Sequence, residues 1–420
     1  MATKTATNAW KKVRIDQCFD IQQGKQVSKS NRLGRNQHPF LRTANVFWGE
    51  LDLATLDHMH FTEAEEERLA LRKGDLLVCE GGDVGRTAMW HDELERCYYQ
   101  NHLHRLRKNT DEIDENFVLL YLQYAFVYAK LYFGRANVTT IPNLSKSRLS
   151  ELEIAQPSLV EQKAIAQTLT TIQNAIAEQE KLVAKLQELK RSMMKHLFTH
   201  GTKDEKTKLT EIGEMPESWD VTKMGSICKN ELRNGAFARR NQFGSGYLFA
   251  NVVDMYGGLH LGYDKLERVN LPEKEILRFA LKDGDILFVR SSLKRDGVAQ
   301  CSVVRNMPEM TIYDCHLIKA EIDTSLAIPE FVANYWRSDL GKRELVQRSK
   351  TTTMTTINQN GLEAASLPLP SLIEQGKIID ALQSVDEKVS VAKAKLVIYG
   401  NLFKTLLHEL MSGERRIQSI

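Results

Sequence analysis

The 420-residue chain has few cysteines and no long apolar run, and each shortage excludes a class of protein. Its six cysteines are scattered, without a C-x-x-C pair or the paired spacing of a secreted disulfide framework. We therefore expect reduced, mostly buried thiols and no metal site. No stretch reaches the ~18 apolar residues of a membrane helix, and the first residues lack the apolar core of a signal peptide. These absences predict a cytoplasmic protein.

Catalytic and nucleotide-binding motifs are missing as well. The sequence contains no G-x-x-x-x-G-K-[ST] loop, no G-x-S-x-G and no H-E-x-x-H, and its eleven histidines do not cluster. The nearest glycine-rich loop, "EGGDVGR" at residues 80–86, is replaced by "RSSLKRDGV" at the equivalent place of the second half, so no phosphate-binding pattern is retained. We expect no catalytic residue and no cofactor of the chain's own, and interpret both loops as turns that approach a ligand.

The overall charge balance is only slightly basic. A composition of 42% hydrophobic and 26% charged residues is typical of a soluble globular protein, and the length allows two or three domains. The net charge of +3 and the pI of about 8.4 lie below the values of a uniformly basic nucleic-acid binder. Any basic surface must therefore be local.

One short stretch of sequence occurs twice. "SLVEQKAI" at residues 158–165 returns as "SLIEQGKI" at residues 371–378. Other pairs follow in the same order at an offset of roughly 210 residues, including "RKGDLLV" with "KDGDILF" and "TTIPNLSKSRLSELEIAQP" with "TTINQNGLEAASLPLP". So long an offset indicates a duplicated domain rather than a solenoid repeat.

Each half is predicted to be a mixed α/β (α+β) globular unit followed by a long helix. Short apolar runs such as "DLLVCE", "AMW" and "DILFVR" between glycine-rich turns indicate strands, while "ENFVLLYLQYAFVYAKLYF" and "PEFVANYWRSDLGKREL" indicate buried helices. The predicted boundaries are 1–156 and 201–369 for the globular domains, 157–200 and 370–413 for the helices, and 414–420 for a tail.

The two long helices carry apolar residues in alternating steps of four and three, with a lapse at Lys190. Proline precedes each helix and glycine follows it. The main seam positions are Ile165, Leu169, Ile172, Ile176, Val183 and Leu186, and Ile378, Leu382, Val385, Val389, Leu396 and Phe403. Helices of this length span roughly 60 Å. A pseudo-twofold arrangement would pair them as an antiparallel coiled coil that separates the globular domains, although core helices of a larger bundle show the same periodicity.

Two stretches, residues 21–49 and 232–253, contain no acidic residue and are rich in Arg, Lys, Asn, Gln and Ser. Cations neutralise DNA phosphates, while Arg and Lys read guanine and Asn and Gln read adenine. The candidate DNA-binding residues here are Lys25, Gln26, Ser28, Lys29, Asn31, Arg32, Arg35, Asn36, Arg42, Arg233, Asn234, Arg239, Arg240, Asn241 and Gln242. Charge runs are usually solvated faces, but the occurrence in both halves favours DNA contact.

Further candidates lie in turns at equivalent places of the two halves. These are the hydroxyl residues Thr139, Thr140, Thr355 and Thr356, and the cations Arg86, Lys294 and Arg295 of the two glycine-containing turns. Hydroxyl side chains commonly bond phosphates. An ordinary turn with a capping hydroxyl would explain the threonines equally well.

The duplicated stretches, with their proline, Glu-Gln pair and heptads, resemble the specificity subunits of type I restriction-modification systems over essentially the whole chain. The resemblance implies a non-catalytic subunit with two target recognition domains that each bind half of a bipartite double-stranded DNA sequence. It also implies that the helices dock two methyltransferase subunits, and that restriction subunits join in some complexes. S-adenosylmethionine, and ATP with magnesium, would be bound by those partners.

This sequence departs from the family pattern in its first copy, where "IAQPSL" replaces the more typical "LPLPSL" and the connecting stretch is three residues longer. Two alternatives remain open. One is a specificity subunit of a modification-only or fused methyltransferase system. The other is a coiled-coil adaptor whose basic loops bind RNA or an acidic protein.

Overall fold

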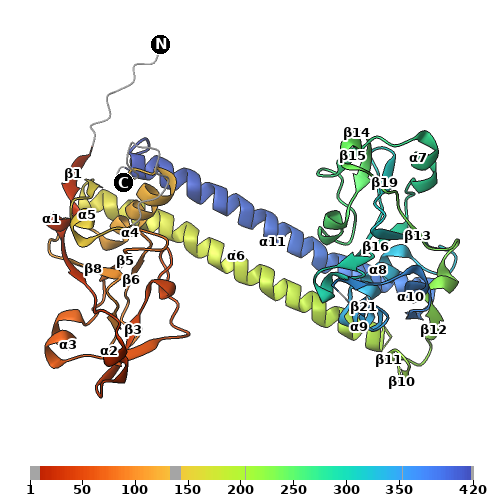
Figure 1. Cartoon of the computed structure of the whole chain (residues 1–420), viewed down its shortest axis with the longest axis horizontal. Helices are drawn as coiled ribbons and strands as arrows, with labels where there is room; N and C mark the ends of the chain where they lie inside the picture. The colour runs from red at the N-terminus through yellow and green to blue at the C-terminus, as the bar shows by residue number, and fades with distance from the viewer. Residues whose placement is uncertain (1–9, 133–142, 204, 352, 418–420) are drawn as a thin grey trace, which may run out of the picture. The chain divides into compact units, whose positions relative to one another are not determined.

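The computed structural model describes residues 10–132, 143–203, 205–351 and 353–417 (Figure 1). The chain forms two compact units: unit 1 consists of Met1–Glu180 and Ala394–Ile420, and unit 2 of Lys181–Lys393. The long helices α6 (Leu159–His200) and α11 (Leu372–Ser412) each contribute to both units. No helix among the described residues is long and apolar enough to span a membrane.

Unit 1 contains a four-stranded antiparallel sheet, a three-stranded sheet and a two-stranded ribbon. The strand order of the four-stranded sheet is β2 (Phe19–Gln23), β8 (Leu103–Lys108), β5 (Leu76–Cys79) and β6 (Thr87–Met89). The strand order of the three-stranded sheet is β4 (Asp57–His60), β3 (Gln37–Leu41) and β7 (Tyr98–Tyr99). The ribbon pairs β1 (Lys11–Arg14) with β9 (Glu153–Gln156). Its shorter helices are α1 (Ile15–Cys18), α2 (Lys29–Leu33), α3 (Glu63–Leu69), α4 (Glu115–Gln123) and α5 (Lys146–Ser150).

Unit 2 repeats these three sheets with the same strand order and directions. The four-stranded sheet consists of β13 (Arg233–Asn234), β20 (Leu317–Glu321), β16 (Asp285–Val289) and β18 (Cys301–Val303). The three-stranded sheet consists of β15 (Glu267–Val269), β14 (Phe243–Ala250) and β19 (Thr311–Tyr313), and the ribbon pairs β12 (Asp220–Lys223) with β23 (Ser366–Leu369). The shared topology confirms the duplicated mixed α/β fold.

Some elements occur in unit 2 without a counterpart among the described strands of unit 1. These are a sheet of β17 (Ser291–Ser292), β22 (Thr355–Thr356) and β21 (Lys350–Thr351), and the hairpin of β10 (Thr207–Thr210) and β11 (Gly213–Pro216). The shorter helices of unit 2 are α7 (Glu273–Phe279), α8 (Pro329–Arg337), α9 (Asp339–Gln347) and α10 (Gln359–Glu363).

The strands predicted from "DLLVCE" and "DILFVR" are β5 and β16, and every residue in them is buried. Successive side chains of a strand point to opposite faces. In β5, Leu76 and Val78 belong to one hydrophobic cluster while Leu77 and Cys79 belong to another, and β16 divides in the same way. Two cores therefore cover each strand, which explains why the sequence runs apolar without alternating. All six cysteines are free, four of them buried.

The predicted buried helices are present, but the second one is broken. The stretch "PEFVANYWRSDLGKREL" forms α8 and α9, which meet at Ser338. The Ser338 hydroxyl accepts a hydrogen bond from the amide of Gly341 at 3.2 Å and caps α9. A Cβ on Gly341 would lie 2.2 Å from the carbonyl oxygen of Tyr335. The first turn of α9 thus packs against the end of α8 at a distance that only glycine allows.

The predicted seam positions of α6 and α11 are all buried or half-buried. The lapse at Lys190 is filled by an ion pair, because its Nζ lies 2.6 and 2.8 Å from the carboxylate oxygens of Asp386. Thirteen residues after Lys190, Lys203 pairs with Glu374, which lies twelve residues before Asp386. Within unit 2 the two helical segments therefore run antiparallel.

The glutamine of the repeated Glu-Gln pair joins each long helix to its globular unit. Gln162 and Gln375 are completely buried. In unit 1 the Gln162 side chain donates to the carbonyl oxygens of Pro157 and Glu112 and accepts from the amide of Asp114, all at 2.9 Å. Gln375 makes the same three bonds with Pro370, Leu326 and Ile328. The duplicated glutamine therefore fixes the start of the long helix beside the start of α4 or α8.

The glutamate of the pair binds a cation beyond the end of the other long helix. Glu161 accepts two bonds from Arg416, at 2.6 and 2.8 Å. Glu374 is 1% exposed and pairs with Lys203 at 2.7 Å, while the amide of Thr202 donates to it at 3.1 Å. We call these two ion pairs the helix latches. They explain why the motif is present twice, since each copy closes its own unit.

Candidate nucleic-acid interface

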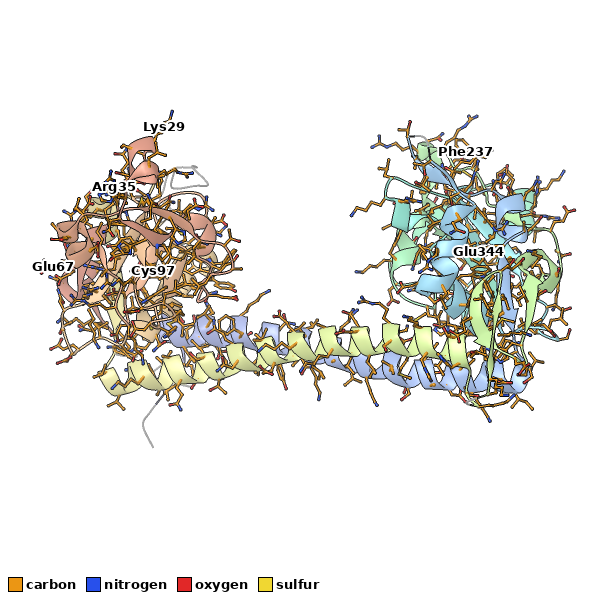
Figure 2. The ribbon with its side chains drawn as sticks, turned by 90° about the horizontal axis from the view of Figure 1, so that it is seen from below. Lys29, Arg35, Glu67, Cys97, Phe237 and Glu344 are labelled. Carbon is orange, nitrogen blue, oxygen red and sulfur yellow. The ribbon has the colours of Figure 1, made fainter. Side chains whose placement is uncertain are left out.

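Most candidate residues of unit 1 lie on or beside α2. We call residues 25–36 the unit 1 basic loop. Ser28 caps the helix by accepting from the amide of Asn31 at 3.2 Å. Figure 2 shows Lys29 and Arg35 at the end of unit 1 opposite the long helices. Both side chains are exposed and, within the described part of the chain, neither makes an ion pair. Gln26 is exposed as well.

The other predicted cations of unit 1 are held by acidic residues from outside the acid-free stretch. Lys25 is 10% exposed, and its Nζ lies 2.5 Å from Glu65 of α3. Arg42 and Arg32 lie 3.2 and 3.6 Å from Asp57 of β4. These pairings neutralise part of the positive charge that the sequence alone predicted for this surface.

Two more unit 1 candidates are also engaged within the protein. Arg86 lies 3.4 Å from Asp83 and donates to the carbonyl oxygen of Thr43 at 3.1 Å. The side-chain amide of Asn36 donates to Glu66. Thr139 and Thr140 lie outside the described residues. The candidate residues of unit 1 that stay exposed without an ion pair among the described residues are therefore centred on Lys29, Arg35 and Gln26.

In unit 2 the predicted cations are open to solvent. Arg233, Arg239 and Arg240 lie in the unit 2 basic loop (residues 233–242), and all three are exposed. In the region that the structure describes, none of them takes part in an ion pair. The side chains of Asn234 and Gln242 hold the loop, since Asn234 accepts from Gln359 at 3.0 Å and Gln242 accepts from the amide of Arg239 at 2.8 Å. Asn241 is exposed beside them.

The turn that carries Lys294 and Arg295 follows β17, the strand that pairs with Thr355 and Thr356 of β22. The hydroxyls of Ser291 and Thr356 are 3.0 Å apart across the β17–β22 pair. Lys294 and Arg295 are exposed, whereas Thr355 is 3% exposed and bonds the hydroxyl of Thr351 at 3.1 Å. The two predicted cations thus lie in the turn that follows a strand paired with Thr355 and Thr356, and Thr355 itself is buried.

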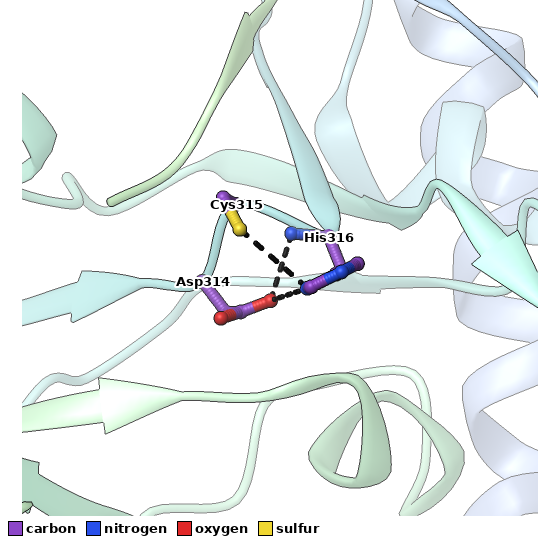
Figure 3. A group of neighbouring side chains, drawn as sticks. All are labelled: Asp314, Cys315 and His316. Carbon is purple, nitrogen blue, oxygen red and sulfur yellow. Dashed lines mark hydrogen bonds and ion pairs between the residues drawn. The ribbon is translucent and has the colours of Figure 1, made fainter. Parts of the chain in front are cut away.

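A cluster that was not predicted backs the unit 2 basic loop. One donor atom each from Asp314, Cys315 and His316 lies within 4.8 Å of the others (Figure 3). Asp314 Oδ1 is 2.7 Å and Cys315 Sγ is 3.5 Å from the same nitrogen, His316 Nδ1. A relay triad needs the two partners on different ring nitrogens, so this is a hydrogen-bonded turn rather than a nucleophile with its base. Burial and the neighbouring Asp314 raise the pKa of the Cys315 thiol.

One hollow of unit 2 is lined by none of the residues of the basic loop. It has a volume of about 670 Å³ and is lined by α8, residues 256–260 and the two long helices. Two of its three acidic residues are in ion pairs: Asp386 with Lys190, and Glu330 with Arg305 at 2.6 Å. The third, Glu387, accepts a hydrogen bond from Gln383 at 3.0 Å. Burial alone would raise the pKa of Glu330, but hydrogen bonds from His260 and Arg305 lower it to about 2. A carboxylate held so firmly ionised cannot donate a proton near neutral pH.

The described residues form two copies of one mixed α/β unit, and each copy has an exposed basic loop. The family model described as "Type I restriction modification DNA specificity domain" matches residues 8–191 and again 216–397. The chain therefore belongs to the family of type I restriction-modification specificity subunits, which confirms the resemblance found in the sequence.

Individual relatives agree along nearly the whole chain. The MjaVIII specificity subunit of Methanocaldococcus jannaschii is 24% identical over 86% of this chain and 83% of its own length. The EcoKI specificity subunit of Escherichia coli is 21% identical over 92% of this chain and 84% of its own length. Among solved structures, the S subunit from M. genitalium superposes with a TM-score of 0.57 at 17% identity, covering 98% of both chains. A chain of another type I system gives a TM-score of 0.61 at 15% identity and covers 98% of this chain and 100% of its own length. At these identities the structures show a shared fold.

Proposed function

We propose that this chain is the non-catalytic subunit that selects the DNA sequence for a type I restriction-modification complex. Unit 1 binds one half of a bipartite double-stranded target and unit 2 binds the other. The observation that carries this proposal is that both units of the duplicated fold present exposed cations and amides, without ion-pair partners among the described residues, on a basic loop: Lys29, Arg35 and Gln26 in one, Arg233, Arg239, Arg240 and Asn241 in the other.

These side chains have the chemistry that duplex recognition requires. Arg and Lys contact phosphates or bond guanine, and Asn and Gln bond adenine in the major groove. Each wrong base pair costs ~1 to 3 kcal/mol, so two short half-sites together give a discrimination that one alone does not. A covalent link between the two units raises the effective concentration of the second contact. The helices α6 and α11 would set the spacing between the half-sites.

The same long helices would bind two methyltransferase subunits and, in a complete system, restriction subunits. Exposed apolar side chains on α11 support a protein partner, since Val397, Ile398 and Leu402 are 63%, 61% and 43% exposed. The relatives are named as subunits of restriction enzymes. S-adenosylmethionine, and ATP with magnesium, would be held by the partners, and the complex would act in the cytoplasm, where its DNA lies.

Methylome sequencing tests this function. Cells that carry the gene together with its methyltransferase partner are compared with cells that carry the methyltransferase alone. We expect a bipartite, asymmetric methylated sequence that disappears without this chain, and its two parts give both half-sites. An unchanged methylome in cells where both proteins are present and form a complex would overturn the proposal.

A further inference from the structure

The unit 2 basic loop holds an exposed aromatic ring. Phe237 is 66% exposed, whereas Ala236 before it is 1% exposed and Ala238 after it packs against a hydrophobic cluster. Figure 2 shows Phe237 near the end of unit 2 remote from the long helices. Full burial of such a side chain is worth ~1.5 to 3 kcal/mol. The loop thus buries Ala236, partly buries Ala238 and leaves the large apolar Phe237 exposed to water.

The backbone around Phe237 is fixed before any ligand arrives. The amide of Ala236 donates to the carbonyl oxygen of Tyr313 at 2.8 Å, and the amide of Cys315 donates to Ala236 at 2.9 Å. A Cβ on Gly235 would lie 2.0 Å from the Tyr313 carbonyl oxygen, so only glycine permits this approach. On the other side, Gln242 accepts from the amide of Arg239 at 2.8 Å. Because both flanks are anchored, ordering the loop costs little when it binds.

The charges beside Phe237 indicate what the ring meets. Arg233, Arg239 and Arg240 are exposed and suited to binding phosphates on either side of the loop tip. An apolar side chain that lies between these cations in the sequence would then reach the stacked bases. Proteins that insert Phe, Leu or Met between base steps partly unstack them and kink the duplex.

We propose that Phe237 is a wedge that inserts between two neighbouring base pairs of the half-site bound by unit 2. This inference rests on the proposed function and adds a sequence-selecting contact to it, because easily unstacked steps such as TA and CA accept a wedge at lower cost. Unit 1 has the same backbone bonds at Lys25, with Tyr99 and Asn101, but Gln26 occupies the place of Phe237. The wedge therefore belongs to one half-site only.

Fluorescence of 2-aminopurine in the target duplex tests the wedge. The probe is placed at each position of the half-sites except the methylated base, in duplexes carrying the sequence found by methylome sequencing, and the chain is used as its complex with the methyltransferase. We expect the unmodified complex to raise the fluorescence at one step of the half-site of unit 2 at least about twofold. Phe237→Ala should abolish that rise and weaken binding about tenfold, while Phe237→Trp should restore both. A rise and an affinity that survive Phe237→Ala would overturn the wedge.

Matched variants separate failure of the wedge from failure of DNA binding by unit 2. Leu209→Ala removes another exposed apolar side chain of unit 2, 86% exposed in the hairpin β10–β11, and should change neither signal. Arg239→Ala with Arg240→Ala should reduce the dependence of log Kd on log salt by about two, whereas Phe237→Ala should leave that slope unchanged because the ring carries no charge. If the arginine substitutions weaken DNA binding and Phe237→Ala changes neither signal, only the wedge proposal is wrong. If neither the arginine substitutions nor Phe237→Ala changes DNA binding, the proposal that this face of unit 2 binds DNA is wrong as well.

Discussion

The two units share their strand order but use their basic loops differently. In unit 1, Lys25 is paired with Glu65, and Arg42 with Asp57. In unit 2, Arg239 and Arg240 are exposed and, among the described residues, have no acidic partner. Both loops looked alike as acid-free stretches of sequence. The comparison teaches that a charge run predicts a basic surface only when no acidic residue folds over it from another element.

The difference also fits a target whose halves differ in sequence. The same fold exposes different side chains in its two copies. The basic loop of unit 1 exposes a lysine, an arginine and an amide, and that of unit 2 exposes several arginines and an aromatic ring. The sheets, the buried glutamines and the helix latches are common to both units. The shared residues therefore build and attach the recognition domain, while the residues that differ would read the DNA.

The largest effect is expected when the exposed cations of each basic loop are removed, which tests whether the two units contribute differently to DNA binding. Arg239→Ala with Arg240→Ala should weaken DNA binding about 100-fold, because each lost phosphate or guanine contact costs ~1 to 3 kcal/mol. The pair Lys29→Ala with Arg35→Ala should weaken it about tenfold, since unit 1 offers fewer free cations. Binding is measured by fluorescence anisotropy of the methyltransferase complex on its target. Size-exclusion chromatography should show unchanged complex assembly, and a loss of assembly would show that these loops bind protein rather than DNA.

The helix latches allow a second comparison. Arg416 supplies both hydrogen bonds from the tail to Glu161 and also lies over the Trp10 ring at 5.2 Å, so Arg416→Ala should lower the free energy of unfolding by about 2 kcal/mol. Lys203→Ala should cost less, because Thr202 still bonds Glu374. Hydrogen exchange separates the effects, with faster exchange expected in unit 1 for the first variant. Equal losses in the free energy of unfolding would show that Lys203 stabilises its latch as much as Arg416 does.

Lys25 distinguishes a structural cation from a recognition cation. Lys25→Met removes the ion pair to Glu65 and the bond to the carbonyl oxygen of His60, and should lower the stability of unit 1 by about 1 kcal/mol. The salt dependence of DNA binding should stay as in the unmodified protein, whereas Lys29→Ala should reduce it. A reduced salt slope for Lys25→Met would return Lys25 to the DNA-binding surface.

The smallest expected effect depends on pH. The pKa of Glu330 lies at about 2 in the folded protein, below its ordinary value of 4.5. Its contribution to stability is therefore complete above about pH 4.5 and is lost as the pH falls toward 2. Between about pH 5 and about pH 3, unit 2 should lose about 1 kcal/mol more than the Glu330→Gln variant does, after allowance for solvent screening. Denaturant titrations at each pH measure this. The substitution itself should leave unit 1 unchanged at every pH, since Asn116 occupies the equivalent position there.

Much of the fold was predictable because its signals are local. The apolar runs of β5 and β16, the heptads of α6 and α11, and the prolines and glycines at the helix ends are all patterns within one segment. The break at Ser338 was missed, because it depends on the contact between Gly341 and Tyr335 that forms only when α9 turns back on α8.

The candidate site was predictable only in part, for the same physical reason. The positions of Lys29, Arg35, Arg239 and Arg240 on exposed loops followed from composition. The ion pair between Lys25 and Glu65 did not, because these residues are forty positions apart and meet only in the folded unit. Phe237 was not singled out either, since a phenylalanine between two alanines usually indicates a buried strand rather than an exposed ring.

The division of unit 1 into two stretches of chain determines when each unit can finish folding during synthesis. Unit 2 is one continuous segment, so all of its residues have been made once Lys393 is joined. Unit 1 begins first, yet its segment of α11 and Arg416 come last. Until then Glu161 lacks its ion pair, and the hydrophobic cluster that contains Leu169 lacks Phe403 and the other members that α11 supplies. Domains generally fold in the order in which they are synthesised. Here the half that emerges first from the ribosome must be the last to close.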